Sequence, residues 1–144
     1  MAGKKWRKSK DPLFRGDMKD CVRPPVPGAD SSIVRHIMYL EGPGRETPYL
    51  SVTELEENAK HFAGKTGAVW NTTVPTAESL GVEHMSHIEL LSQLNGNGKG
   101  KAKWKSPFEV MQARRYVEQW AEHLLDFRRT SDVKSALKKL FKKI

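Results

Sequence analysis

The stretch Pro48-Tyr49-Leu50-Ser51-Val52-Thr53 decides the fold that we expect for this chain of 144 residues. It is short and rich in aromatic and β-branched residues, which is typical of a strand. An amphipathic segment with helical spacing follows over residues 54–63, and after a glycine turn a second strand is expected over residues 68–74, ending at Pro75. This strand–helix–strand order predicts a mixed α+β domain.

Periodicity and breaker residues predict the remaining elements. Residues 33–40 read Ile-Val-Arg-His-Ile-Met-Tyr-Leu and form a strand candidate. Thr53 suits the N-cap of the helix that follows it, with Glu56 three residues later at the capping-box position. Short helices are expected at residues 76–80 and 86–94. A longer helix is expected from residue 107 to 125, although its last residues are also compatible with a strand.

Positive charge is the strongest signal in the composition. The chain carries 25 Lys and Arg against 17 Asp and Glu, a formal net charge of +8. Basic residues gather in residues 1–10, in residues 99–105 and in residues 131–144, where an amphipathic helix is expected. Such clusters favour polyanions, RNA above all, through counterion release, but solvated tails and loops explain them equally well. The candidate nucleic-acid contacts are Lys99, Lys101, Lys103, Trp104 and Lys105.

Several classes of protein and site are not expected. No apolar run approaches the roughly 18 residues that span a bilayer. No apolar stretch follows the basic N-terminus, so no secretory signal peptide is expected. Cys21 is the single cysteine, which excludes an internal disulfide and a cysteine-based metal centre. His84 and His87 have no third ligand in register, so we expect no zinc site.

A second motif, Phe14-Arg15-Gly16-Asp17, places an arginine after an aromatic residue, close to a possible strand start. A guanidinium is suited to gripping phosphate, because its planar fork pairs with phosphate oxygens in a bidentate way. Taken alone, the motif is more simply an exposed Arg-Gly-Asp turn. Its place before the Ser-x-Thr strand reverses that preference. Arg35 is the alternative phosphate-binding residue.

In this order the two motifs resemble the mono-ADP-ribosyltransferase toxins of the cholera-toxin-like arginine–serine–glutamate group. The resemblance spans residues 11–130, with a basic tail at residues 1–10 and a basic amphipathic helix at residues 131–144. It implies an α+β fold in which two small antiparallel sheets form an NAD cleft, with flanking helices. It also implies a monomeric transferase that uses NAD as co-substrate. The acceptor of ADP-ribose would be a macromolecule, with RNA slightly favoured over protein.

The resemblance implies roles for individual residues. Arg15 would grip the NAD pyrophosphate, and Ser51 would orient the catalytic glutamate. The family carries Glu-x-Glu or Gln-x-Glu late in the domain; here Glu122 is the candidate, and Trp120 stands where the upstream Glu or Gln would be, which argues against arginine as acceptor. Glu118, Glu109 and Glu89 are the alternative acids. The expected NAD-binding residues are Phe14, Arg15, Gly16, Asp17, Arg35, His36, Tyr49, Ser51 and Thr53.

Three alternatives stay open at this stage. Other branches of the same fold use a histidine that bonds the adenosine ribose and a tyrosine that stacks on nicotinamide, and His36 and Tyr49 suit those roles. A basic nucleic-acid-binding or nuclease toxin without NAD chemistry would explain the charge. A non-enzymatic adaptor would dock through the C-terminal amphipathic helix.

The length of the chain is similar to that of catalytic domains at the C-termini of bacterial polymorphic and type VI secretion toxins. This resemblance implies a bacterial effector that leaves its cell without a cleavable signal peptide and acts in the cytoplasm of a target cell. It also implies a cognate immunity protein that blocks the cleft.

Overall fold

The protein is described here by a computed structural model, which covers residues 5–39 and 46–144. Within this part the chain forms six strands, six α-helices and one 3-10 helix, η1 (Gly100–Ala102). The strands are β1 (Leu13–Asp17), β2 (Tyr49–Thr53), β3 (Ala68–Thr72), β4 (Glu83–Met85), β5 (Glu122–Asp126) and β6 (Lys142–Lys143). The helices are α1 (Ile33–Tyr39), α2 (Glu56–Ala63), α3 (Val74–Ser79), α4 (His87–Gln93), α5 (Pro107–Gln119) and α6 (Val133–Leu140). No helix of the described part is long and apolar enough to cross a membrane.

The strands form one open sheet in the order β4-β5-β2-β1-β3-β6, and every pair of neighbours is antiparallel. The expected α+β class is confirmed. Two separate sheets are not found in the described residues, because β1 and β2 join the two halves of the sheet. They do so through a single registered pair, Phe14 with Thr53, whereas β1–β3 and β2–β5 each pair over five residues. The sheet is therefore weakly joined at its centre.

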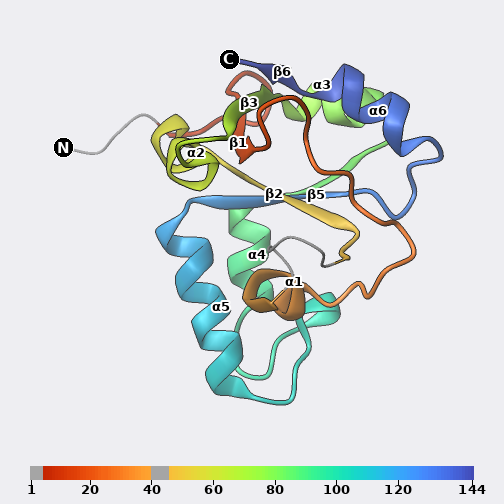
Figure 1. The fold of residues 1–144 in the computed structure, drawn as a ribbon. Coiled ribbons are helices and arrows are strands. Elements are labelled where there is room, and N and C mark those ends of the chain that lie inside the picture. Colours follow the sequence, from red (N-terminus) through yellow and green to blue (C-terminus); the bar gives the residue numbers. More distant parts are fainter. Residues whose placement is uncertain (1–4, 40–45) are drawn as a thin grey trace.

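Two hydrophobic cores cover opposite faces of the β2–β5 pair, since successive side chains of a strand point to opposite faces. Tyr49 and Leu124 enter the core formed with α1, α4 and α5, here called the lower core. Leu50 and Leu125 enter the core formed with α3 and α6, the upper core. Figure 1 shows these two sets of helices below and above the β2–β5 pair. All five residues of β5 are buried, so this strand forms the centre of the layered fold.

The strand expected at residues 33–40 is wrong, because residues 33–39 form helix α1. Ile33, Val34 and Ile37 follow helical spacing and are buried in the lower core. The Ser32 hydroxyl accepts a hydrogen bond from the Arg35 main-chain N–H at 3.2 Å, which supports the first turn. Burial at helical spacing therefore outweighs the β-propensity of the branched residues. Leu40 lies outside the described residues.

Two expected helix boundaries are also wrong. Leu55 rather than Thr53 is the N-cap of α2, because the Thr53 hydroxyl donates to the main-chain oxygen of Trp120 at 2.6 Å. Helix α5 stops at Gln119 and does not continue to residue 125. A bend at Ala121, with a φ of +45°, then turns the chain into β5.

Both chain ends contribute to the packing. The expected C-terminal helix covers only Val133–Leu140, and β6 then pairs with β3. Leu140 and Phe141 are buried in the upper core, against which Trp6 of the expected N-terminal tail also packs. Residues 1–4 of that tail lie outside the described residues.

Helix α2 packs closely on β1, and this contact requires a glycine at position 16. A Cβ atom added to Gly16 would lie 2.1 Å from the main-chain oxygen of Ala59 and 2.5 Å from the main-chain nitrogen of Ala63. Both atoms belong to the backbone of α2, which cannot move away as a flexible side chain would. The Arg-Gly-Asp sequence is thus part of a strand under a helix, and not an exposed turn.

We predict that Gly16→Ala displaces α2 and destabilises the fold by about 1–3 kcal/mol, the usual cost of overpacking a filled site. Gly28→Ala is the matched control, because a Cβ atom added there meets nothing within 4 Å. Urea unfolding of the two variants and the wild type measures the difference. Equal stability of the two variants would contradict the close approach of α2.

Candidate functional site

Three residues from distant parts of the chain meet in one pocket of about 140 Å³. Arg15 lies on β1, Ser51 on β2 and Glu122 on β5. The pocket lies where β1 and β2 share their single registered pair. Its complete lining is Phe14, Arg15, Gly16, Ser51, Val52, Thr53, Phe62, Trp120 and Glu122.

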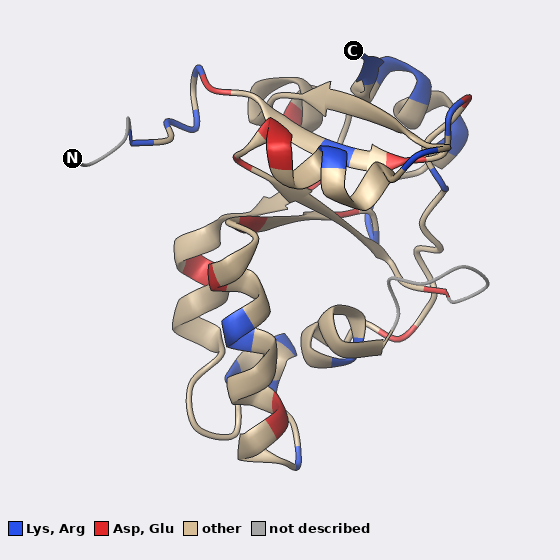
Figure 2. Cartoon of the chain, turned by 60° about the vertical axis from the view of Figure 1, so that its left-hand side comes forward, with Lys and Arg blue, Asp and Glu red and all other residues tan. Residues whose placement is uncertain are grey.

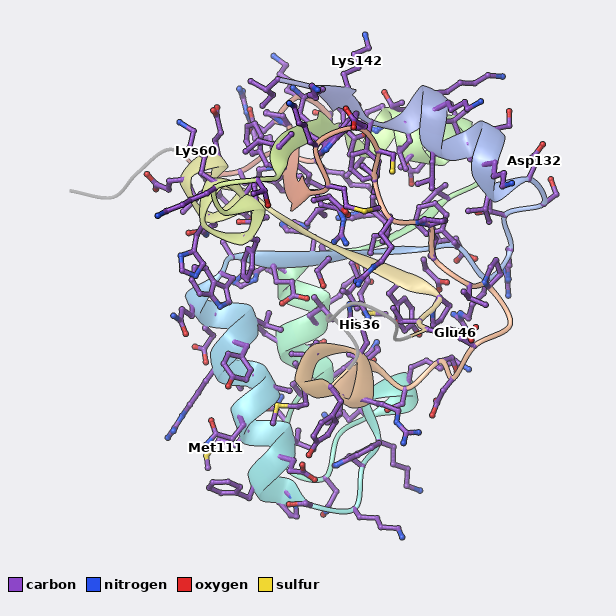
Figure 3. The ribbon with its side chains drawn as sticks, in the orientation of Figure 1. His36, Glu46, Lys60, Met111, Asp132 and Lys142 are labelled. Atoms are coloured by element: carbon purple, nitrogen blue, oxygen red, sulfur yellow. The ribbon has the colours of Figure 1, made fainter. Side chains whose placement is uncertain are left out.

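A chain of hydrogen bonds leads from the lower core to the carboxylate of Glu122. The Ser51 hydroxyl donates to Glu122 Oε2 at 2.6 Å. His36 Nε2 lies 2.8 Å from the same hydroxyl, and His36 Nδ1 lies 2.7 Å from the hydroxyl of Thr47. Figure 3 shows His36 on α1, beneath the strands of the sheet. Glu122 is 5 % exposed, so its carboxylate is held in a largely water-free position.

The direction of these hydrogen bonds follows from the protonation of His36. Burial lowers the pKa of His36 to about 3, and the positive charges of Arg15 and Arg23 add to the effect. A neutral ring carries one N–H. Because the Ser51 proton points to Glu122, His36 Nε2–H donates to the Ser51 oxygen, and Nδ1 accepts from Thr47. The Ser51 hydroxyl is therefore held by His36, and through it by Thr47, so that its proton is directed toward Glu122.

The guanidinium of Arg15 crosses the weak junction of the sheet. Its Nη1 donates to the main-chain oxygen of Ser51 at 2.8 Å, and its Nε pairs with Asp17 Oδ2 at 2.7 Å. Both side chains are largely buried, with exposed fractions of 12 % for Arg15 and 6 % for Asp17. The two contacts fix the plane of the guanidinium at the pocket wall. Of its five N–H donors, they engage two.

A second pocket, of about 280 Å³, adjoins the first and shares Phe62, Trp120 and Glu122 with it. Its remaining lining residues are Ile37, Met38, Tyr39 and Tyr116. The Phe62 ring meets the Trp120 ring edge-to-face at 4.7 Å between centroids. Glu122 therefore lies at the junction of two pockets, and the second pocket is walled mainly by aromatic rings.

Four of the nine expected NAD-binding residues do not line the first pocket. Arg35 is exposed and pairs with Asp30 at 3.0 Å. Tyr49 is buried in the lower core, where its hydroxyl donates to the main-chain oxygen of Ser31. His36 reaches the site only through Ser51, and Asp17 only through Arg15.

The alternative acids do not line either pocket. Glu118 pairs with Arg114 on the surface of α5, at 3.8 Å. Glu89 belongs to the capping box of α4. Glu109 accepts hydrogen bonds from Trp104 and Tyr39.

The expected nucleic-acid-binding residues lie in the loop between α4 and α5. All four lysines are exposed, whereas Trp104 is partly buried against the lower core. Figure 2 shows a second concentration of Lys and Arg at the C-terminal end, on α6. Two basic surfaces thus lie at opposite ends of the molecule.

Sequence reasoning missed several contributors to the site. Thr47 and Asn58 are ordinary polar residues whose roles depend on tertiary contacts; Asn58 donates to the main-chain oxygen of Trp120 at 3.2 Å. Phe62 lies on α2, where its spacing indicates a core position, but it is 49 % exposed at the mouth of the pockets. The one sequence signal for Phe62 as a site residue is a large aromatic side chain at the end of an amphipathic helix.

Comparison of the chain with models of protein families, with curated proteins and with solved structures finds no match. The function of the chain is therefore inferred from the geometry of its site and the motifs of its sequence.

We predict that the fold loses stability as the pH falls from 7 to 5. The pKa of His36 in the folded chain, about 3, lies below the ordinary value of 6.5. Between these two pKa values the unfolded chain binds a proton at His36, whereas the folded chain does not. The contribution of His36 to the free energy of unfolding is therefore complete above pH 6.5 and decreases progressively as the pH falls below it. The loss for His36 is about 2 kcal/mol between pH 7 and pH 5.

Urea unfolding at both pH values measures this dependence. His36→Gln should weaken it, whereas His61→Gln, at an exposed histidine on α2, should leave it unchanged. An unchanged pH dependence in His36→Gln would contradict the neutral state of the buried ring.

Proposed function

We propose that this chain is an NAD-dependent mono-ADP-ribosyltransferase with an ADP-ribosyltransferase-like cleft. The observation that supports the proposal best is the convergence of Arg15, Ser51 and Glu122, from three strands, on one pocket. The sequence motifs predict these three residue types in this order. Their hydrogen bonds also suit the roles that the resemblance implies.

The chemistry of NAD cleavage requires what these residues offer. Breaking the nicotinamide–ribose bond passes through a state in which the ribose carries positive charge, as in glycoside hydrolysis. A preoriented carboxylate stabilises that charge, and Glu122 is held by the Ser51 hydroxyl in this manner. The remaining N–H donors of Arg15 suit the pyrophosphate oxygens. Phe14 and Phe62 provide apolar walls against which the planar rings of NAD can pack.

The transfer step balances without a further reactant. The bond between ribose C1′ and the nicotinamide nitrogen breaks, and nicotinamide leaves with the electron pair. A nucleophilic atom of the acceptor forms the new bond to C1′, and its proton passes to the Glu122 carboxylate. Arg15 holds the pyrophosphate in place, and Ser51 keeps the carboxylate oriented.

The second pocket is the proposed acceptor site, because it reaches the same carboxylate from another side. Tyr39, Tyr116, Phe62 and Trp120 provide aromatic surface on which an unpaired base stacks. The Tyr39–Glu109–Trp104 contacts connect this pocket with the lysine-rich loop, residues 99–105. These features favour RNA slightly over protein as the acceptor.

The size and charge of the chain suit an effector domain of a polymorphic or type VI secretion toxin. Such a domain would be delivered to the cytoplasm of a target cell and neutralised by an immunity protein.

We predict that Glu122→Gln lowers NAD cleavage by about 10²–10³-fold, because the amide keeps the shape but loses the charge that stabilises the ribose cation. Glu118→Gln, the same change on the surface of α5, should retain wild-type activity. Incubation with radiolabelled NAD and a bacterial lysate, separated into protein and RNA fractions, measures both cleavage and transfer.

Label in one fraction, lost in Glu122→Gln alone, supports the transferase and identifies the acceptor class. Intact NAD with every variant, combined with cleavage of RNA, would replace the proposal with the nuclease alternative. Label that survives Glu122→Gln would move the catalytic acid elsewhere.

We predict that Tyr116→Ala raises the KM for an RNA acceptor about 5- to 150-fold, since one stacked base contributes about 1–3 kcal/mol. NAD cleavage in the absence of acceptor should be unchanged, because Tyr116 lines only the second pocket. Phe108→Ala is the control, an exposed aromatic residue on the same helix outside both pockets. A raised KM for NAD in Tyr116→Ala would instead assign the second pocket to NAD.

A further inference from the structure

The main chain that carries Glu122 is bent in a conformation that needs support. Ala121, directly before it, has a φ of +45°, in the left-handed region that residues with a side chain rarely adopt. A residue in this region costs free energy and persists only where its surroundings determine it. The contacts that support this bend come from the end of β2, from the connection between β2 and α2, and from α4.

Glu54 holds both neighbours of Glu122 at once. Its main-chain N–H donates to the oxygen of Ala121 at 3.2 Å. Its carboxylate accepts a hydrogen bond from His123 Nε2 at 2.7 Å. The residues before and after Glu122 are therefore held by a single residue of the connection between β2 and α2.

Two further contacts complete this support. The Thr53 hydroxyl donates to the main-chain oxygen of Trp120 at 2.6 Å. His87 Nδ1 donates to the main-chain oxygen of Glu122 at 3.1 Å. Four successive residues, 120–123, are thus each held by a residue of β2, of the β2–α2 connection or of α4.

The ring of His123 is fixed in one orientation. Burial is the main cause that lowers its pKa to about 3, and that of His84 to about 4, so both rings are neutral. Because His123 Nε2–H donates to Glu54, its Nδ1 accepts from His84 Nε2–H, at 2.9 Å. The Trp6 ring covers the pair, with its centroid 4.4 Å from that of His123. The contact with Glu54 is therefore a partly buried hydrogen bond of a neutral histidine.

We propose that Glu54 and His123 are positioning residues, which hold Glu122 in place from the reverse face of the sheet. Neither side chain lines the first pocket. They act on the main chain on either side of Glu122, so the carboxylate meets the Ser51 hydroxyl without rearrangement. The kinetic part of this inference rests on the proposed function.

The kinetic test compares Glu54→Ala with Glu54→Gln in the full chain. Glu54→Ala removes the acceptor for His123 and should lower kcat for NAD cleavage about 10- to 100-fold, the usual effect of a small misplacement of a reacting group. The KM for NAD should stay within about twofold, since the pocket lining is unchanged. Glu54→Gln keeps an acceptor oxygen and should restore kcat to within about twofold of the wild type.

Glu57→Ala is the matched control, the same substitution at an exposed position of α2. Thermal unfolding of each variant gives the fraction of folded protein, and kcat is calculated per folded molecule. Unchanged kcat in Glu54→Ala, or an equal loss in Glu54→Gln and Glu54→Ala, would overturn the proposal.

A second measurement does not depend on the transferase activity. In the NMR spectrum, the side-chain carboxyl carbon of Glu122 should shift in Glu54→Ala and stay in place in Glu57→Ala. No shift in Glu54→Ala would overturn the positioning role whatever the activity. A shift in a protein that leaves NAD intact would support the positioning role and reject the proposed function instead.

Discussion

The antiparallel pairing of β2 with β5 is the interaction on which the rest of the structure depends. Its five registered residues bring Ser51 and Glu122 to one face, although 71 positions separate them in the chain. The same pairing directs Leu124 into the lower core and Leu125 into the upper core. A shift of one residue in this register would move each side chain of the shifted strand to the opposite face of the sheet. The register that builds the two cores is therefore the one that assembles the site.

The site itself combines rigid support with an open junction. Glu122 is held through its side chain by Ser51 and through its main chain by His87. On the other side of the pocket, β1 and β2 share only one registered pair, and Arg15 crosses that junction through the main-chain oxygen of Ser51. This arrangement fixes the charged groups in advance and leaves space between them, which is the condition for electrostatic stabilisation of a developing charge.

The sequence predicted those parts of the fold that rest on local pattern, and the structure corrects those that rest on tertiary contacts. The strand around Ser51, helix α2 and strand β3 follow from periodicity, and the α+β class follows from their order. The strand predicted over residues 33–40 is wrong because Ile and Val favour strands, whereas burial of one face in the lower core selects a helix over residues 33–39. The bend at Ala121 and the contact of Glu54 with His123 have no local signature, because both depend on residues nearly 70 positions away.

The position of β5 between β4 and β2 has a consequence for biosynthesis. Residues 122–126 lie late in the chain, yet they separate β4 from β2, which are both made earlier. Pairings between segments so distant in sequence form slowly, since closing a long loop precedes the gain from contact. A nascent chain on the ribosome lacks this strand, and with it Glu122, until both β4 and β2 have emerged. Any activity of this site therefore waits until residues 122–126 have left the ribosome.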